Sequence, residues 1–452
     1  MPRFVERELR AFLDCGILAR GFLRVRCKDC GAERLVAFSC KGRGFCPSCT
    51  SRRMSDSAAH LVDRVFPEAP LRQWVLSLPI PLRYHLAYDH ELCSAVLGVF
   101  LRAVFGALQR RAAEELGVAG GRSGSVTFVQ RFGGSINLHT HFHAIVLEGV
   151  YADPEGTGSP RFFALSPPSD EEIARVTTSV AKRIVRLLIR RGLLDEGGPR
   201  PADPLAEEEP LLAACAQASV QHRIATGLRA GKRVMRLGDR IEIEDVESRA
   251  GEQCAAVQGF SLHAGVAIGG RDRKRIERLC RYISRPPIAR ERLLELPDGR
   301  IAYRLRHPWR DGTTHVVFEP TELIEKLAVL VPWPRSNALR YHGVFAPGAK
   351  WREAVIRDRS DPPPPVATDP AARSQGADSF LRPRYLAWAK LIARVFESEV
   401  LVCPQCSGAA EVIAAITQPP VIQAILKSLG LCPRAPPIAP ARLAPQQLAA
   451  EF

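Results

Sequence analysis

Three histidines stand at every second position of one short, mostly apolar stretch. His139, His141 and His143 lie within "INLHTHFHAIVLEGV", residues 136 to 150. Side chains two residues apart in a strand point to the same face, so a strand here would hold three imidazoles side by side. Such a row could chelate a divalent cation and leave positions open for substrate oxygens. A solvent-facing strand with incidental histidines is the alternative, and the regular spacing favours the metal site.

Cysteine pairs with the spacing C-x2-C suggest a second kind of metal site. Cys27 and Cys30 form one knuckle, and Cys46 and Cys49 form another after 15 intervening residues. Two knuckles can direct four thiolates at one tetrahedral centre. This spacing therefore predicts a structural Zn2+ site.

A further knuckle, Cys403 and Cys406 in "VCPQCSG", supplies only two ligands. Cys15 and Cys40 could complete a second zinc site with it if the two ends of the chain meet, and Cys432 is another candidate. The alternative is a vestigial knuckle without metal. In a reduced, intracellular protein, an odd total of 13 cysteines argues against a disulfide framework and favours metal binding where the cysteines cluster.

A tyrosine on a strongly basic helix is the candidate nucleophile. The stretch "RDRKRIERLCRYIS" predicts a helix that ends before Pro286, and this helix carries Tyr282. Its basic neighbours in the sequence are Arg273, Lys274, Arg275, Arg278, Arg281 and Arg285. Positive charges of this kind attract a phosphate and favour attack by the phenol oxygen. An aromatic side chain that anchors the helix to a sheet is the competing interpretation.

The charge of the whole chain points to a polyanionic partner. The 452 residues include 63 Lys and Arg against 48 Asp and Glu, a formal net charge of +15. A basic surface favours nucleic acid because each phosphate contact releases counterions, whereas solubility alone is the alternative explanation. Four basic residues of the first cysteine region are candidate DNA contacts: Lys41, Arg43, Arg52 and Arg53.

Nothing in the sequence suggests export or insertion into a membrane. The first residues are charged and lack the apolar core of a signal peptide. The longest apolar run, "AVLGVFLRAVFGAL", is interrupted by Arg102 and is too short to span a bilayer comfortably. We therefore expect a cytoplasmic protein with no membrane segment.

The surrounding pattern predicts an α+β fold. A long helix should run from His90 to the break at Gly117, and an earlier helix could begin with Ser55 as its N-cap. Two strands, 125–132 and 136–151, are joined by turn residues and should pair antiparallel. We expect a central antiparallel sheet flanked by helices, with a small N-terminal domain of the zinc-ribbon type and a small C-terminal segment that combines a helix with a zinc knuckle.

Composition divides the chain into four regions. Residues 1–70 would form the N-terminal zinc-binding domain and residues 71–350 the main domain. Residues 351–380 have the composition of a linker, and residues 381–452 combine a helix, the C-x2-C knuckle and a Pro-rich tail expected to be disordered.

Several motifs together resemble a known family. His-Phe-His at 141 to 143 is similar to the His-hydrophobic-His motif of the HUH endonucleases, which cut single-stranded DNA with a helix-borne tyrosine. The stretches "FSCKGRGFCPSCTSRRM", "FVQRFGGSINLHTHFHAIVLEGVY", "RLCRYISRPPIARERL" and "RDGTTHVVFEPTELI" resemble, in the same order, the rolling-circle transposases of the IS ninety-one family of bacterial insertion sequences, particularly its ISCR-type branch. The likeness covers nearly the whole chain.

The resemblance implies an HUH-type catalytic domain over residues 71–350 and a catalytic metal ion. His141 and His143 would hold Mg2+ or Mn2+ against the scissile phosphate, together with a third ligand. His139 is the nearest candidate for that ligand, and Gln130 and His263 lie on strands that could neighbour it.

The resemblance also implies a transposase that nicks and joins DNA. Tyr282 would attack the phosphate and leave a 5′-phosphotyrosine and a free 3′-OH, with Arg278, Arg281 and Arg285 near the DNA. The implied partners are single-stranded DNA at the ends of the element and target DNA in the bacterial nucleoid. The founding pattern of the family has two tyrosines four residues apart, but Arg278 and Pro286 stand at those positions here, which fits the ISCR-type branch.

Two other functions stay open at this point. A rolling-circle replication initiator or relaxase would use the same chemistry, and a zinc-ribbon DNA-binding protein would have no catalysis. The N-terminal cysteine block and "GTTHVVFEP" favour the transposase. Tyr84 and Tyr88 have the four-residue spacing but precede the histidine strand, and we interpret them as packing residues.

Overall fold

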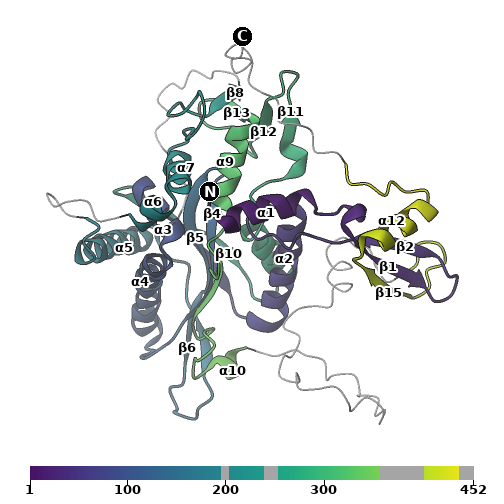
Figure 1. Ribbon diagram of the computed structural model, residues 1–452. Coiled ribbons are helices and arrows are strands. Elements are labelled where there is room, and N and C mark those ends of the chain that lie inside the picture. Colours follow the sequence, from purple (N-terminus) through teal and green to yellow (C-terminus); the bar gives the residue numbers. More distant parts are fainter. Residues whose placement is uncertain (195–202, 239–252, 357–401, 437–452) are drawn as a thin grey trace. The chain divides into compact units, whose positions relative to one another are not determined.

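The computed structural model describes residues 1–194, 203–238, 253–356 and 402–436 (Figure 1). It divides into two compact units. The large unit comprises Met1–Leu9 and Gly42–Ala387, and the small unit comprises Arg10–Lys41 and Trp388–Phe452. Most of the predicted linker, the helix expected just after it and the Pro-rich tail lie outside the described residues. The small unit therefore combines segments of the regions predicted as N-terminal and C-terminal domains.

The large unit is built on a six-stranded antiparallel sheet with the order β14-β4-β5-β3-β10-β9. Its strands are β3 (Leu71–Ser77), β4 (Gly124–Phe132), β5 (Leu138–Leu147), β9 (Cys254–Val257), β10 (Phe260–Ile268) and β14 (Leu339–Gly343). β4 and β5 form the predicted antiparallel pair. The histidine strand thus lies in the interior of the sheet, between β4 and β3.

Side chains of β5 alternate between two hydrophobic cores. Phe142, Ala144 and Val146 join one core with helices from one face of the sheet, whereas Ile145 and Leu147 join the other. The helices of the first core are α4 (His90–Leu116) and α5 (Asp170–Arg190), and those of the second are α2 (Pro47–His60) and α8 (Arg273–Ile283). Residues 139, 141 and 143 are separated from Ile145 and Leu147 by even numbers of positions. They therefore share the face of the sheet that α8 covers.

Capping residues set the ends of these helices. Asp89 accepts a hydrogen bond from the backbone N–H of Leu92, and Gly117 ends α4 with a φ of 66°, so the predicted helix is confirmed. The prediction that a helix begins at Ser55 is wrong, because α2 already begins at Pro47. Proline is favoured in the first helical turn, where its missing N–H has no partner to lose.

α4 is long and apolar enough, by length and composition alone, to cross a membrane. However, 61% of its most apolar window is buried inside the protein. Val96, Phe100 and Val104 pack against the sheet. Burial in the core accounts for the apolar composition of this helix.

The rest of the large unit contains a second antiparallel sheet, of order β11-β12-β13-β8, and the pair β6-β7. These strands are β6 (Gly149–Ala152), β7 (Arg161–Ala164), β8 (Met235–Gly238), β11 (Leu293–Glu295), β12 (Ile301–Arg304) and β13 (Thr313–Phe318). Helix α1 (Arg3–Leu13) begins in the large unit and ends in residues of the small unit. The other helices of the large unit are η2 (Leu61–Val65), α3 (Ile80–Tyr88), α6 (Pro204–Glu208), α7 (Pro210–Val220), η3 (Arg290–Arg292), α9 (Pro320–Leu330) and α10 (Arg352–Val355). A third core, which includes Tyr303 and Phe318, joins the second sheet to α7 and α9.

The small unit is a three-stranded sheet of order β15-β1-β2. Its elements are η1 (Leu18–Arg20), β1 (Phe22–Cys27), β2 (Glu33–Ala37), β15 (Ala410–Ile416) and α12 (Pro419–Ser428). β15 pairs antiparallel with β1, with Cys27 opposite Ala410. Together the two units confirm an α+β fold with antiparallel sheets and flanking helices.

Candidate functional site

The histidine row, defined as His139, His141 and His143, brings three imidazole rings next to one another on β5. The ring centroids of His139 and His141 are 4.7 Å apart, and those of His141 and His143 are 4.8 Å apart. Nε2 of His141 lies 3.0 Å from Nε2 of His143. Two adjacent ligands about 2.1 Å from one octahedral cation are about 3 Å apart. The separation of the two nitrogens therefore fits a shared divalent cation.

Hydrogen bonds orient these rings. Nδ1 of His141 donates to the backbone oxygen of His139 over 2.8 Å, so Nε2 of His141 keeps its lone pair. Nε2 of the Gln73 amide lies 2.8 Å from Nδ1 of His143 and donates to it, which places the proton of that ring on Nε2. With the amide flipped, the Gln73 oxygen would accept from Nδ1 and free Nε2 for a metal ion. Nε2 of His139 is buried and has no hydrogen-bond partner among the described residues. This orphaned nitrogen, beside two oriented imidazoles, fits a third metal ligand.

Burial keeps the histidine row uncharged. It lowers the pKa of His139 to about 3 and that of His141 to about 4, and it holds the pKa of His143 well below the ordinary 6.5. The positive charge of Arg285 further lowers the pKa of His141 and His143. Neutral imidazole is the form that binds a metal ion, so the environment prepares all three rings as ligands.

Gln130 and His263, the other two candidates for the third ligand, lie at different distances from the row. Gln130 of β4 pairs directly with His141, and its buried amide nitrogen donates to the backbone oxygen of Ile283 over 2.9 Å. His263 lies on β10, which is separated from β5 by β3, with Val75 in the intervening position. Two strand spacings amount to roughly 10 Å. The structure thus places Gln130 beside the row and His263 farther away.

Tyr282 lies near the C-terminal end of α8, the helix that packs on the face of the sheet that carries the histidine row. Ile276, Cys280 and Ile283 face the core, which turns Tyr282 outward with 42% of its surface exposed. Among the tyrosines in the described ranges, Tyr282 is the only exposed one. The hydrogen bond from Gln130 to Ile283 ties this end of α8 to the strand beside the histidine row. An accessible phenol therefore stands at the helix end that is bonded to the strand beside the candidate metal ligands.

Tyr84 and Tyr88 lie on α3, and their hydroxyl groups form hydrogen bonds within the fold. The hydroxyl of Tyr84 donates to Oδ2 of Asp203 over 2.7 Å, and that of Tyr88 donates to the backbone oxygen of Val329 over 3.3 Å. Burial, together with Asp203, raises the pKa of Tyr84, and burial raises the pKa of Tyr88 to about 12. The interpretation of both as packing residues is confirmed.

Two guanidinium groups flank the ring of Tyr282. Cζ of Arg285 lies 4.4 Å from the ring centroid and Cζ of Arg306 lies 5.0 Å from it. Arg285 also donates from Nη1 to the backbone oxygen of Tyr282 over 2.8 Å. Planar guanidinium donors bind phosphate oxygens in pairs, so this arrangement can hold a phosphate at the phenol. Sequence reasoning missed Arg306, which follows β12, because no motif connects it with α8.

The other predicted DNA contacts differ in their surroundings. Arg281 is half-buried and pairs with Glu277, Nη2 to Oε1, over 2.5 Å. The exposed members of the set are Lys41, Arg43, Arg52, Arg53 and Arg278. Their exposure is compatible with contact to DNA, and their role stays a prediction.

In the small unit, knuckles from the two ends of the chain form a four-cysteine group, here named the ribbon cluster: Cys27, Cys30, Cys403 and Cys406. Its four ligand atoms lie within 4.8 Å of one another. Sγ of Cys27 is 3.5 Å from Sγ of Cys406, and Sγ of Cys30 is 3.6 Å from Sγ of Cys403. Four sulfurs about 2.3 Å from a tetrahedral Zn2+ are about 3.8 Å apart. The ribbon cluster therefore needs little adjustment to hold zinc.

Backbone N–H groups within the knuckles favour thiolates. Those of Gln405 and Cys406 lower the pKa of Cys403 to about 7. The N–H of Cys30 lowers the pKa of Cys27. Because a cysteine must lose its proton to bind zinc, the turn geometry supports metal binding at the first cysteine of each knuckle. The neighbouring thiols raise the pKa of Cys30 and raise that of Cys406 to about 12.

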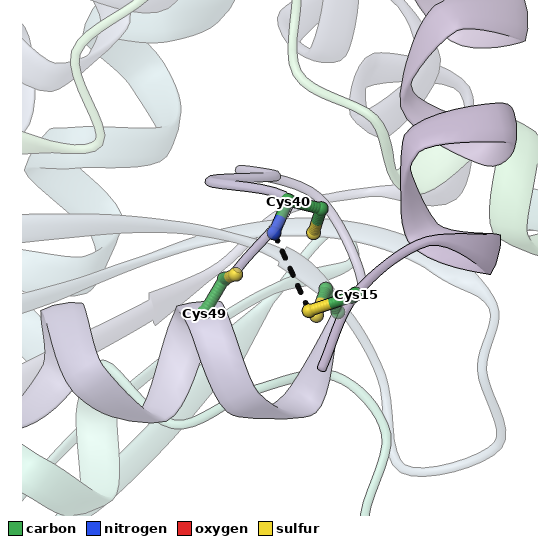
Figure 2. Close-up of side chains that lie close together, drawn as sticks. Cys15, Cys40 and Cys49 are labelled. Atoms are coloured by element: carbon green, nitrogen blue, oxygen red, sulfur yellow. Dashed lines mark hydrogen bonds between the residues drawn. The ribbon is translucent and has the colours of Figure 1, made fainter. Parts of the chain in front are cut away.

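The remaining candidate ligands form a second group, here named the helix cluster: Cys15, Cys40, Cys46 and Cys49. Their ligand atoms also lie within 4.8 Å of one another. Figure 2 shows the side chains of Cys15, Cys40 and Cys49 gathered in one place, with the backbone N–H of Cys40 donating to Sγ of Cys15 over 3.4 Å. Cys46 precedes α2 as its N-cap, and Cys49 follows in the first turn. This set of four sulfurs fits Zn2+ as well.

These two clusters correct the pairing predicted from the sequence. The first N-terminal knuckle shares its centre with the C-terminal knuckle, not with Cys46 and Cys49. Cys15 and Cys40 join the second N-terminal knuckle, not the C-terminal one. The reason lies in strand pairing, because β15 adds to β1 in a register that places the C-terminal knuckle beside Cys27. All eight cysteines named as ligands nevertheless belong to one of the two clusters.

Two family models match the chain. One, described as "Putative transposase", matches residues 124–353, just over half of the chain. The other, described as "Transposase zinc-binding domain", matches residues 1–78. The first region contains the histidine row and Tyr282, and the second contains the helix cluster and one knuckle of the ribbon cluster. No curated protein and no solved structure matched.

Proposed function

This chain belongs to the IS ninety-one family of transposases, and we propose that it cuts and rejoins single-stranded DNA through a covalent phosphotyrosine. The position of Tyr282 carries the proposal. Its phenol is exposed, it is flanked by Arg285 and Arg306, and the helix end that bears it is bonded through Gln130 to the strand beside the histidine row. The proposed nucleophile and phosphate-binding groups thus stand at the end of α8 that is bonded to the strand beside the proposed metal ligands.

Cleavage requires one displacement at phosphorus. Oη of Tyr282 attacks the scissile phosphate in line, and a bond from Oη to phosphorus forms as the bond from phosphorus to the 3′ oxygen breaks. The phenol proton passes to solvent, and the departing 3′ oxygen takes up a proton. The products are a 5′-phosphotyrosine and a free 3′-OH. Arg285 and Arg306 hold the phosphate at the ring and offset its charge.

The histidine row would hold the catalytic metal ion. His141 and His143 are the firmest ligands, and His139 is the best-placed third ligand because its buried Nε2 has no partner among the described residues. Mg2+ or Mn2+, when bound there, supplies charge stabilisation at a non-bridging phosphate oxygen. Gln73 and the backbone oxygen of His139 orient the two firm ligands.

Rejoining follows from the same bond. A phosphotyrosine retains the energy of a phosphodiester, so a 3′-OH of another strand can reverse the displacement without ATP. One turn before Tyr282 stands Arg278 rather than a second tyrosine, so each chain would hold one DNA end at a time. We infer that the substrates are single-stranded DNA at the ends of the element and target DNA in the bacterial nucleoid.

A gel assay for the covalent intermediate tests this function. Single-stranded oligonucleotides from both flanks of the gene, labelled at the 3′ end, are incubated with Mg2+ or Mn2+ and the full-length chain. The unmodified chain should form a labelled adduct that survives denaturation, and Tyr282→Phe should form none. Tyr88→Phe is the matched control, because that hydroxyl is bonded to the backbone oxygen of Val329 and to the side chain of Arg131, and it should keep the adduct.

Each other outcome points to a different assignment. An adduct with Tyr282→Phe would remove this tyrosine from its role. Binding without cleavage by the unmodified chain would favour a non-catalytic zinc-ribbon protein. Cleavage confined to a replication or transfer origin, with none at the flanks of the gene, would favour a replication initiator or relaxase.

A further inference from the structure

The outer side of α4 and α5 contains a hollow of ≈ 440 Å³ rich in arginine, here named the arginine groove. Its lining residues are Val99, Arg102, Arg183, Arg186, Ile189 and Arg190. The inner sides of both helices pack on the face of the sheet that carries Phe142 and Ala144. The histidine row lies on the opposite face. The arginine groove is therefore on the other side of the sheet from Tyr282.

Among the described residues, no acidic side chain forms an ion pair with the arginines of this groove. α5 has its acidic residues in the first turn, and Arg183 comes 11 residues after Glu172, about 16 Å along the helix axis. Beyond Lys182, every charged residue of α5 is an arginine. In the described part of the chain, the ion pairs of α4 and α5 involve Arg111 instead. Four guanidinium groups that line one hollow repel one another. An anionic ligand bound between them would reduce this repulsion.

The spacing of the arginines fits the backbone of a DNA duplex. Arg183, Arg186 and Arg190 stand at positions i, i+3 and i+7, which cover about 10 Å of one face of α5. One strand of a duplex presents roughly three phosphates over that length. Guanidinium groups bind such oxygens with two parallel donors. Because the lining contains no aromatic ring on which an unpaired base could stack, a duplex fits the groove better than a single strand.

We propose that the arginine groove binds the phosphate backbone of double-stranded DNA that flanks the strand cut at Tyr282. This inference rests on the proposed function, because it assigns a second DNA contact to the same transposase. The two faces of the central sheet would then have different roles in DNA binding. The α8 face cuts a single strand, and the α4–α5 face holds the adjoining duplex without reading its sequence.

A salt titration with a triple variant tests the proposal. Arg183→Gln/Arg186→Gln/Arg190→Gln is compared with Arg110→Gln/Arg175→Gln, a control on the same helices at arginines whose charges act on Glu172. Two probes are used, a single-stranded oligonucleotide from the flank and the same strand extended by a duplex of ~20 base pairs. The slope of log affinity for the extended probe against log salt should fall in magnitude by about 3 in the triple variant only. Cleavage of the single-stranded probe should be unchanged.

Two results would overturn the proposal. One is an unchanged slope and unchanged affinity for the extended probe. The other is an equal loss of cleavage on the single-stranded probe, because the groove would then hold the cut strand. Failure of the unmodified chain to cut any probe would contradict the proposed function instead, and the duplex titration would still report on the groove. Circular dichroism of both variants checks that the fold is intact.

Discussion

The histidine row and the ribbon cluster are both candidate metal centres, but the chain builds them in opposite ways. The row lies within one strand in the interior of a six-stranded sheet. The ribbon cluster joins two knuckles whose nearest cysteines, Cys30 and Cys403, are 373 residues apart in the sequence. At the row, a fold that is complete without metal positions the ligands. At the ribbon cluster, the ligands help to hold the fold together.

The hydrophobic cores around the two candidate metal centres differ in size, which supports this difference. Among the described residues of the small unit, the buried hydrophobic cluster comprises Phe22, Ile422 and Leu426, with five partly buried apolar side chains packed against it. At about 1.5–3 kcal/mol for each buried side chain, these three contribute roughly 5–9 kcal/mol. A structural Zn2+ site typically contributes about 10–16 kcal/mol. Zinc should therefore decide whether the small unit folds, whereas the large unit has three extensive cores of its own.

The largest effect is expected from removal of one ribbon-cluster ligand. Cys403→Ser should reduce the bound zinc from two ions per chain to one, because three thiolates no longer close the tetrahedral site. The segment around β15 should then become sensitive to protease, while the large unit stays resistant. Metal analysis and limited proteolysis measure both effects.

Cys432→Ser is the matched control for this variant. Cys432 lies in the same unit, is exposed and belongs to neither cysteine cluster. Two zinc ions and an unchanged protease pattern are expected for it. The same result for Cys403→Ser would contradict the idea that zinc holds the two ends of the chain together.

A smaller effect, on rate rather than on folding, is expected at the histidine row. His141→Ala should lower DNA cleavage on the order of 10²–10³-fold, the scale of losing one transition-state stabilising group. His139→Ala should lower DNA cleavage by a factor in the same range, because the buried Nε2 of His139 is the best-placed third ligand. Affinity for Mn2+, measured by electron paramagnetic resonance, should fall in both variants, while the thermal midpoint changes little.

His263→Ala controls for the loss of an imidazole on the same sheet. Because β3 separates its strand from the row, its cleavage rate and Mn2+ affinity should match those of the unmodified chain. A loss at His263 with none at His139 would exchange their roles.

Features encoded by local sequence were predictable. Strand alternation requires His139, His141 and His143 to share a face, and the structure confirms a strand there. The helix that ends at Gly117 was also predictable, because glycine readily adopts the positive φ of a C-cap.

Long-range register was not predictable from one sequence. The C-x2-C spacing indicates which cysteines bind metal, but the choice of partner depends on the pairing of β1 with β15. That pairing depends on how the side chains of both strands pack on α12, which no local pattern reveals. Arg306 is a similar case, because only the folded second sheet brings it over the ring of Tyr282.

The smallest effect is expected at Gln130, which connects the two halves of the proposed catalytic site. Its amide nitrogen donates to the backbone oxygen of Ile283, so Gln130→Ala should let the end of α8 shift and lower the rate about tenfold. Gln109→Ala is the matched control, since that side chain makes the same kind of bond, over 2.9 Å, to the backbone oxygen of Gly121. Its rate should not change.

Gln130→Glu separates positioning from ligation. A carboxylate cannot donate to the oxygen of Ile283, so a positioning role predicts the same tenfold loss of rate with Mn2+ affinity unchanged. If Gln130 were instead the third ligand, the carboxylate would preserve or strengthen Mn2+ binding, because divalent cations of this kind favour charged oxygen ligands, and Gln130→Ala would weaken it. The structure favours the positioning role, because the amide nitrogen is already bonded to the helix that carries the proposed nucleophile.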